Sequence, residues 1–92
     1  DVVLVDCLTL WLSNLMHHER NVARETGALI ETLNASTTPV IVVSNEVGLS
    51  IVPENRLARE FRDAQGRLNQ QIAAAADTVE LVAAGLPLKL KG

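Results

Sequence analysis

Residues 40–56 read VIVVSNEVGLSIVPENR, and this stretch decides the fold class. Its first four residues are apolar and β-branched, which is the pattern of a buried strand. The polar residues Ser44, Asn45 and Glu46 follow at once, and a long helical pattern begins near Pro53. A strand that ends in polar side chains and leads into a helix is typical of an α/β protein, whose ligand sites lie beyond the carboxyl ends of the strands.

Strand and helix patterns alternate along the rest of the chain. The expected strands are residues 2–5, 40–43, 78–83 and 86–90, and the expected helices are residues 8–16, residues 22–33 and the long segment that starts at Pro53. Continuous apolar runs such as residues 2–5 indicate strands covered on both faces. Alternating strands and helices predict right-handed crossovers and a mostly parallel sheet with flanking helices.

The long helix has one apolar stripe at steps of three and four residues. The stripe consists of Leu57, Phe61, Ala64, Leu68, Ile72 and Ala75. Pro53 suits the first helical position, where a missing N–H group costs nothing. Gly66 lies in mid-helix, where glycine costs about 1 kcal/mol relative to alanine. We therefore expect a close packing contact at Gly66.

The composition of the 92 residues limits the class of protein. A hydrophobic share of 48% and a charged share of 21% are ordinary for one folded domain or part of one. The formal net charge is −3 and the basic residues form no tract, which argues against a nucleic-acid partner. No apolar stretch reaches the length of a membrane span, and no secretory signal is visible.

The cysteine content bears on the cellular compartment, and the first residues bear on whether the chain is part of a longer polypeptide. Cys7 has no second cysteine with which to form a disulfide, and this favours a cytoplasmic protein. The sequence opens at Asp1 without a methionine and enters a strand pattern at once. We therefore expect a piece of a longer polypeptide.

Asp6 ends the first apolar run, in the form of a Walker B strand. In such a strand the acid holds Mg²⁺, usually through water, opposite the phosphates of a nucleotide. Many α/β proteins also end an apolar run in Asp for helix capping, and the pattern alone leaves both interpretations open. A carboxylate buried at a strand end would need a metal, a ligand or a cationic partner.

The segment after residue 43 allows similar alternatives. Asn45 is either a turn residue or part of a site, and Glu46 is either a solvated acid or a group that orients a substrate. Gly48 allows the loop to fold back towards the sheet. Arg56 and Arg59 lie near the start of the long helix, where they either grip phosphate oxygens or pair with the neighbouring acids Glu60 and Asp63.

The remaining notable side chains have structural interpretations. His17 and His18 are adjacent, so they point in different directions, and an exposed helix end explains them better than a metal site. Trp11 and Met16 are expected in the core. Cys7 has no cationic neighbour or helix N-terminus that would activate it, which favours a structural role.

Three stretches together closely resemble one family, the bifunctional adenosylcobinamide kinase / adenosylcobinamide-phosphate guanylyltransferases of cobalamin biosynthesis. They are VVLVDCLTLWLSNLM (residues 2–16), VIVVSNEVGLSIVPENRLAREFRDAQGRLNQQIAAAAD (residues 40–77) and VELVAAGLPLKLK (residues 79–91). The resemblance implies a RecA-like P-loop fold. It also implies phosphorylation of adenosylcobinamide by ATP or GTP, then transfer of GMP from GTP through a guanylylated histidine, in a trimer with active sites near the subunit interfaces.

The same resemblance implies roles for individual residues. Asp6 stands at the family's strand-end acid, which contacts the nucleotide or its Mg²⁺. The signature loop beside the active site corresponds to Asn45, Glu46, Gly48, Pro53, Asn55 and Arg56.

Two parts of the family pattern are missing. The phosphate loop G-x-x-x-x-G-K-[ST] does not occur in the chain, and neither His17 nor His18 matches the guanylylated histidine. The resemblance therefore implies that residues 1–92 are the C-terminal portion of a single P-loop domain, inactive by itself. A fragment of another P-loop kinase, and a non-catalytic oligomerisation module that uses Gly66 and its helix, remain as alternatives.

Overall fold

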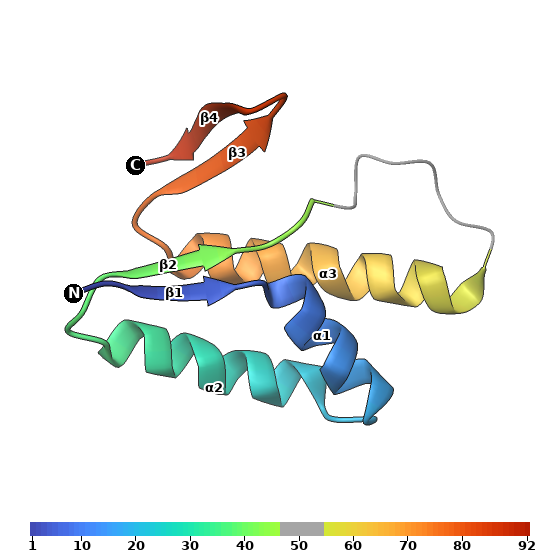
Figure 1. Ribbon diagram of the computed structural model, residues 1–92. Helices are drawn as coiled ribbons and strands as arrows, with labels where there is room; N and C mark the ends of the chain where they lie inside the picture. Colours follow the sequence, from blue (N-terminus) through green and yellow to red (C-terminus); the bar gives the residue numbers. More distant parts are fainter. Residues whose placement is uncertain (47–54) are drawn as a thin grey trace.

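The structure is a computed structural model that describes residues 1–46 and 55–92. Figure 1 shows its strands and helices alternating along the chain, so the α/β class is confirmed. The elements are β1 (Val3–Asp6), α1 (Leu8–His17), α2 (Val22–Ala35), β2 (Val40–Val43), α3 (Arg56–Ala75), β3 (Val79–Ala83) and β4 (Leu86–Lys91).

The first two strands form a parallel pair. Val3 lies opposite Val40, and the register continues to Asp6 opposite Val43. Both strands therefore end at the same edge of the sheet. The predicted parallel pairing is confirmed for this part of the chain.

Only one face of the parallel pair is covered by the described residues. Val5 and Val42 pack against the hydrophobic core. On the opposite face, Leu4 is 62% exposed and Ile41 is 54% exposed. The prediction of strands covered on both faces is wrong for this structure, because the described helices pack against one face of the pair.

The core lies between α1 and α3. Leu8 and Leu12 of α1 meet Ala64 and Leu68 of α3, and each of these four side chains is buried. The periodicity of α1 explains this, since residues four positions apart lie on the same face of a helix. Partly buried residues surround the core, including the expected Trp11 and Met16; the full set is Val5, Trp11, Met16, Val22, Leu29, Val42, Phe61 and Ile72.

The second helix contacts both of the others. Asn21 caps its first turn, because the side-chain oxygen of Asn21 accepts a hydrogen bond from the N–H group of Arg24 at 3.0 Å. Just before the helix, Arg20 forms an ion pair with Glu25 at 2.9 Å. These local contacts define where the chain turns between α1 and α2.

The long helix begins at Arg56, and Asn55 is its N-cap. The side-chain oxygen of Asn55 accepts hydrogen bonds from the N–H groups of Leu57 and Ala58, at 2.8 and 3.2 Å. The prediction that the helix starts at Pro53 is therefore wrong. An asparagine that accepts two of the unpaired N–H groups of the first turn defines the start better than a proline does. Pro53 itself lies outside the described residues.

Gly66 has open space around it. A Cβ atom at Gly66 would have no heavy atom of the described residues within 4 Å, apart from its chain neighbours and the backbone of its own helix. The expected close contact at this glycine is therefore wrong within the described part of the chain, and packing between α3 and its described neighbours does not require the glycine.

The last two strands form a separate antiparallel hairpin, β3–β4. Its turn contains Ala84 and Gly85, both with positive φ angles of 53° and 74°. This is the backbone conformation that suits a tight hairpin turn. The predicted single, mostly parallel sheet is thus replaced by two two-stranded sheets, since the short turn pairs β3 with its neighbour in sequence.

The hairpin is fastened to the end of α3. The ammonium group of Lys91 donates hydrogen bonds to the carbonyl oxygens of Ala73 and Ala74, at 3.0 and 3.1 Å. These carbonyls belong to the last turn of α3, which has no helical N–H partners and favours a cation. Figure 1 shows the hairpin following directly from this end of the helix.

The helices are amphipathic or short. The longest, α3, has 20 residues and carries several charged side chains along its exposed side. Across residues 1–46 and 55–92, no helix combines the length and the apolar character that crossing a bilayer requires.

Candidate functional site

The polar ends of β1 and β2 meet at one edge of the parallel pair. Asp6 lies opposite Val43 in the register, and Ser44, Asn45 and Glu46 continue from there. The sequence pattern predicted that these two strand ends would lie together, and the register confirms it. This edge is where an α/β fold places a ligand.

Asp6 presents its carboxylate at this edge in an exposed position. Strand alternation puts its side chain on the same face as Leu4, away from the core. No residue in the described ranges donates a hydrogen bond to this carboxylate or forms an ion pair with it. The expectation that a buried acid here would need a partner does not apply, because exposure to water removes the cost of desolvation.

Asn45 is held through its backbone from two sides. Its N–H group donates a hydrogen bond to the hydroxyl oxygen of Thr9 on α1 at 3.0 Å. Its carbonyl oxygen accepts one from the side-chain amide of Asn69 on α3, also at 3.0 Å. The chain is therefore tied to both helices immediately before Glu46.

A cluster of three polar side chains lies behind this point, and we call Ser44, Gln65 and Asn69 the Gln65 network. The Gln65 amide nitrogen donates to the hydroxyl of Ser44 at 2.9 Å and to the side-chain oxygen of Asn69 at 3.0 Å. The Ser44 hydroxyl in turn donates to the same Asn69 oxygen at 2.6 Å. The network joins the end of β2 to two successive turns of α3.

Sequence reasoning missed the Gln65 network, although a signal for it was present. Gln65 lies one position after Ala64 and four after Phe61, so it falls on the apolar stripe of the helix. It is fully buried, at 0% exposure. A polar side chain on a buried stripe must find hydrogen-bond partners, and a partner one turn away, Asn69, was visible in the sequence.

The start of α3 holds two of the predicted site residues, Asn55 and Arg56. Asn55 uses its side-chain oxygen as the helix cap. Arg56 forms an ion pair with Glu60, with 3.0 Å between the guanidinium Nε and the carboxylate oxygen, and the two side chains are 84% and 49% exposed. Of the two interpretations left open for Arg56, the structure contains the pairing along the helix. The predicted site residues Gly48 and Pro53 lie outside the described residues.

The histidines end the first helix, as predicted. His17 is the last residue of α1, His18 follows it as the cap, and both are exposed. Their rings meet edge to face, with centroids 5.1 Å apart. Within residues 1–46 and 55–92, no group of three or more His, Cys, Asp or Glu residues could hold a metal ion.

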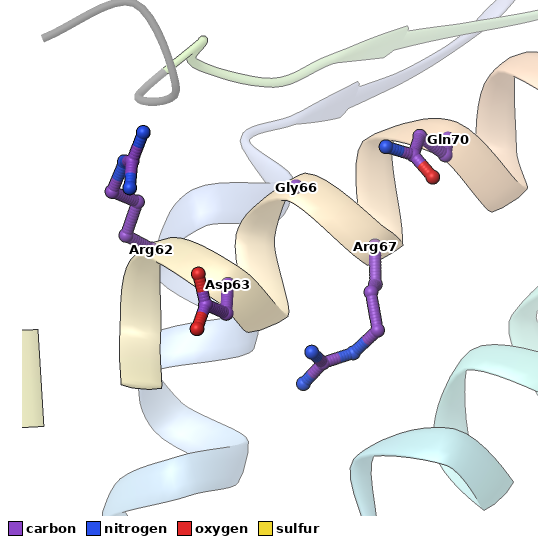
Figure 2. Close-up of a pocket in the computed structure, with 5 residues that line it drawn as sticks. All are labelled: Arg62, Asp63, Gly66, Arg67 and Gln70. Carbon is purple, nitrogen blue, oxygen red and sulfur yellow. The ribbon is translucent and has the colours of Figure 1, made fainter. Parts of the chain in front are cut away.

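The outer side of α3 has an open hollow centred on Gly66 (Figure 2). It is lined by Arg62, Asp63, Gly66, Arg67 and Gln70. Figure 2 shows Arg62 and Arg67 extending from the helix in different directions, with the carboxylate of Asp63 between them. Such an open surface does not enclose a ligand.

A smaller cleft lies between α2 and α3. The hydroxyl oxygen of Thr26 is buried there, with no hydrogen-bond partner among the described residues. The cleft is lined by Val22, Ala23, Thr26, Ala64, Arg67, Leu68 and Gln71. Its mostly apolar lining lies on a different side of α3 from the Gln65 network, which faces the strand ends.

The chain matches known proteins over nearly its whole length. It is 42% identical to the bifunctional adenosylcobalamin biosynthesis protein CobU of Salmonella typhimurium and 41% identical to that of Escherichia coli, covering 99% of this chain and 59% of each relative. It is 45% identical to the bifunctional adenosylcobalamin biosynthesis protein CobP of Pseudomonas aeruginosa, covering 98% of this chain and 53% of the relative.

These figures mean that the chain spans between half and two thirds of the length of the relatives. A family profile also matches residues 1–90, and its description is cobinamide kinase / cobinamide phosphate guanyltransferase. The match extends from the strand that ends at Asp6 to the hairpin β3–β4. The chain therefore belongs to the cobinamide kinase / cobinamide phosphate guanyltransferase family.

Proposed function

We propose that this chain is part of a bifunctional enzyme of adenosylcobalamin biosynthesis. The enzyme phosphorylates adenosylcobinamide with ATP or GTP, and then transfers GMP from GTP to that phosphate to give adenosylcobinamide-GDP. The observation that carries the proposal is the family match over residues 1–90. Because the chain spans only part of its relatives, we assign the two activities to a longer polypeptide that contains it.

We infer that residues 1–92 are the C-terminal portion of one RecA-like P-loop domain. The support is the strand that ends in Asp6, together with the absence of the motif G-x-x-x-x-G-K-[ST] from the 92 residues. That motif supplies the backbone N–H groups and the lysine that hold the phosphates. By itself the chain should therefore bind nucleotide poorly and catalyse neither reaction.

Asp6 is the residue that we assign to Mg²⁺. Mg²⁺ binds through one or two carboxylates, with water and substrate phosphates as its other ligands. The Asp6 carboxylate fits this role, because it is exposed at the ligand edge and none of the described residues occupies it. When bound, Mg²⁺ neutralises charge on the phosphates during transfer. Asp6 would hold it, usually through water, and thereby fix the nucleotide over the strand ends.

The residues after β2 are assigned to the substrate side of the site. Asn45 and Glu46 follow the end of β2, which lies beside the end of β1 that carries Asp6. Gly48 and Pro53 belong to the same signature loop. Asn55 contributes by fixing the start of α3, which is where the loop ends.

We assign Arg56 to a contact with a phosphate group of the bound nucleotide. To make this contact, Arg56 would have to break its exposed ion pair with Glu60. Such a pair contributes only about 0.3–0.5 kcal/mol, so a phosphate group would displace it readily.

The remaining parts of the proposal concern what lies outside this chain. The guanylylated histidine is assigned to another part of the polypeptide, because His17 and His18 come after the strand that ends in Asp6 and neither matches the family's histidine. We also propose a cytoplasmic homotrimer with active sites near subunit interfaces. The resemblance of the signature residues to the family supports this assembly.

Replacement of Asp6 tests the function and the site together. In the longer polypeptide, Asp6→Asn should lower kcat for phosphorylation of adenosylcobinamide about 100-fold, since a metal ion contributes several kcal/mol to stabilisation of the transition state. Stability should not change, because the side chain is exposed. Asp77→Asn is the matched control, as Asp77 is an exposed acid beyond the far end of α3.

The measurements are transfer of labelled phosphate from ATP and of labelled GMP from GTP, at saturating Mg²⁺. Unchanged rates for Asp6→Asn would remove the assignment of Asp6. Turnover of other acceptors but not adenosylcobinamide would favour another kinase of the P-loop class. Assembly in the ultracentrifuge without binding of labelled GTP, in the longer polypeptide, would favour an oligomerisation module.

A further inference from the structure

We propose that Gln65 is a positioning residue for the active site. It acts through Ser44 and Asn69 to fix the end of β2, and so places Glu46 relative to Asp6. The consequence for catalysis rests on the proposed function, while the consequence for the backbone of Asn45 does not. Gln65 is not among the site residues that the sequence analysis predicted.

The location of Gln65 is the first reason. It is completely buried, on the face of α3 that otherwise carries the core residues Ala64 and Leu68. A leucine at this position would continue the apolar stripe of the helix. Burial of a side-chain amide costs free energy unless the amide is hydrogen-bonded. Packing of the core alone would therefore not require a glutamine at this position.

The direction of the hydrogen bonds is the second reason. Both bonds from the Gln65 amide nitrogen go towards the strand end, one to Ser44 and one to Asn69. The side-chain oxygen of Gln65 is buried and accepts no hydrogen bond from the described residues. The orientation of the amide is thus set by the two acceptors. The three bonds among Gln65, Ser44 and Asn69 hold these side chains in one arrangement.

The third reason is the route from Gln65 to the site. Asn69 receives the bonds from Gln65 and Ser44, and its own amide nitrogen donates to the carbonyl oxygen of Asn45. On the other side, the N–H group of Asn45 is bonded to Thr9, in the first turn of the helix that follows Asp6. Asn45 is therefore fixed between the helix after Asp6 and the helix that carries Gln65.

Glu46 is the next residue after this fixed point. A carboxylate or a phosphate contact displaced by about 1 Å can cost about 100-fold in rate. A residue that sets the exit direction of β2 therefore matters for chemistry, although it touches no substrate. Gln65 thus has a role that a purely structural core residue lacks.

The first experiment measures backbone amide hydrogen exchange in the longer polypeptide. Gln65→Leu should make exchange of the Asn45 amide about 10-fold faster, because loss of the network loosens the strand end locally. Exchange of the Leu12 and Leu68 amides in the core should not change. The matched control is Gln71→Leu, the same substitution at an exposed position of the same helix.

A second variant removes a single bond in case Gln65→Leu does not fold. Asn69→Asp keeps the side-chain oxygen that accepts from Gln65 and Ser44, and replaces the nitrogen that donates to Asn45. It should accelerate exchange at Asn45 in the same way. Equal acceleration at Asn45, Leu12 and Leu68 in either variant would show general destabilisation, and would overturn the proposal.

The second experiment measures kinetics in the longer polypeptide. Gln65→Leu should lower kcat for adenosylcobinamide phosphorylation by about 10- to 100-fold, with the KM for nucleotide changed by less than about 3-fold. A residue that only supports the fold would lower the amount of active enzyme and leave the kcat of the active fraction unchanged. Active-site titration with labelled nucleotide separates these cases.

Two further results would overturn the proposal. One is unchanged exchange at Asn45 after loss of the network. The other is locally faster exchange at Asn45 with an unchanged kcat in an active enzyme. If the unsubstituted polypeptide does not phosphorylate adenosylcobinamide, the proposed function fails, and the exchange data alone then decide whether Gln65 positions the strand end.

Discussion

The side-chain oxygen of Asn55 holds two N–H groups at the start of α3, at 2.8 and 3.2 Å. We expect Asn55→Ala to lower the free energy of unfolding by about 1 kcal/mol, as other helix-cap replacements do. Asn55→Asp should retain stability, because a carboxylate oxygen accepts the same bonds and suits the helix N-terminus. Urea denaturation followed by circular dichroism measures both. Equal losses in both variants would contradict the capping role.

The pair between Arg56 and Glu60 allows a different prediction at the same end of the helix. Arg56→Gln should change the free energy of unfolding by less than about 0.5 kcal/mol, since the pair is exposed to solvent and screened. In the longer polypeptide the same variant should raise the KM for nucleotide, because Gln cannot make bidentate bonds to phosphate. Glu60→Gln is the control, as it breaks the pair but keeps the arginine. An unchanged KM would leave Arg56 with only its helical role.

The residues at the strand ends were predictable from the sequence, and those behind them were not. Asp6 follows an apolar run directly and Asn45 follows one after a single serine, so their location at the sheet edge follows from strand geometry alone. Gln65 reaches the candidate site through contacts between α3 and the end of β2, which no local pattern specifies. Its burial was signalled by its place on the apolar stripe, but its partner Ser44 was not.

Among the elements, α3 carries the clearest test of the packing around Gly66. Gly66→Ala should raise the free energy of unfolding of the chain by up to about 1 kcal/mol, because alanine is the better helix former and open space surrounds the position. Thermal and urea unfolding measure this. Destabilisation would mean that the helix has a close neighbour at Gly66.

The same substitution examines assembly of the longer polypeptide. If another subunit approaches α3 at Gly66, the added methyl group should weaken the oligomer while stabilising the chain itself. Sedimentation equilibrium distinguishes these effects. Ala58→Gly is a suitable reverse control, since Ala58 is exposed on the same helix and its replacement should cost stability without affecting a contact at Gly66.

The sequence placed the elements better than it placed their ends and partners. Apolar spacing located α1, α2 and all four strands, because each pattern arises from burial of one side of an element. The start of α3 was misplaced, since Pro53 and Asn55 both suit the beginning of a helix and only the hydrogen bonds distinguish them. The hairpin β3–β4 was wrongly predicted to be part of one parallel sheet. An apolar run shows that a strand is present, but it does not show whether the strand pairs with its neighbour in sequence or with a more distant strand.

For the whole molecule, the face of the parallel pair that residues 1–46 and 55–92 leave exposed should control association. Leu4 and Ile41 form exposed apolar surface on a two-stranded sheet, which favours self-association. We expect Ile41→Lys to reduce concentration-dependent sedimentation and to change the free energy of unfolding by less than about 0.5 kcal/mol. Val42→Lys is the opposing control, because Val42 packs on the core and a charge there should destabilise the chain. Similar stability of the two variants would contradict the one-sided packing.

The separate sheets also have a consequence for how the chain folds. The β3–β4 turn joins neighbouring residues, so this hairpin can form within microseconds, independently of the rest. The partners in β1 and β2 are separated by two whole helices, and the entropy lost on closing that long loop delays their pairing. We therefore expect the edge that carries Asp6 and Asn45 to be assembled late, after the helices have met.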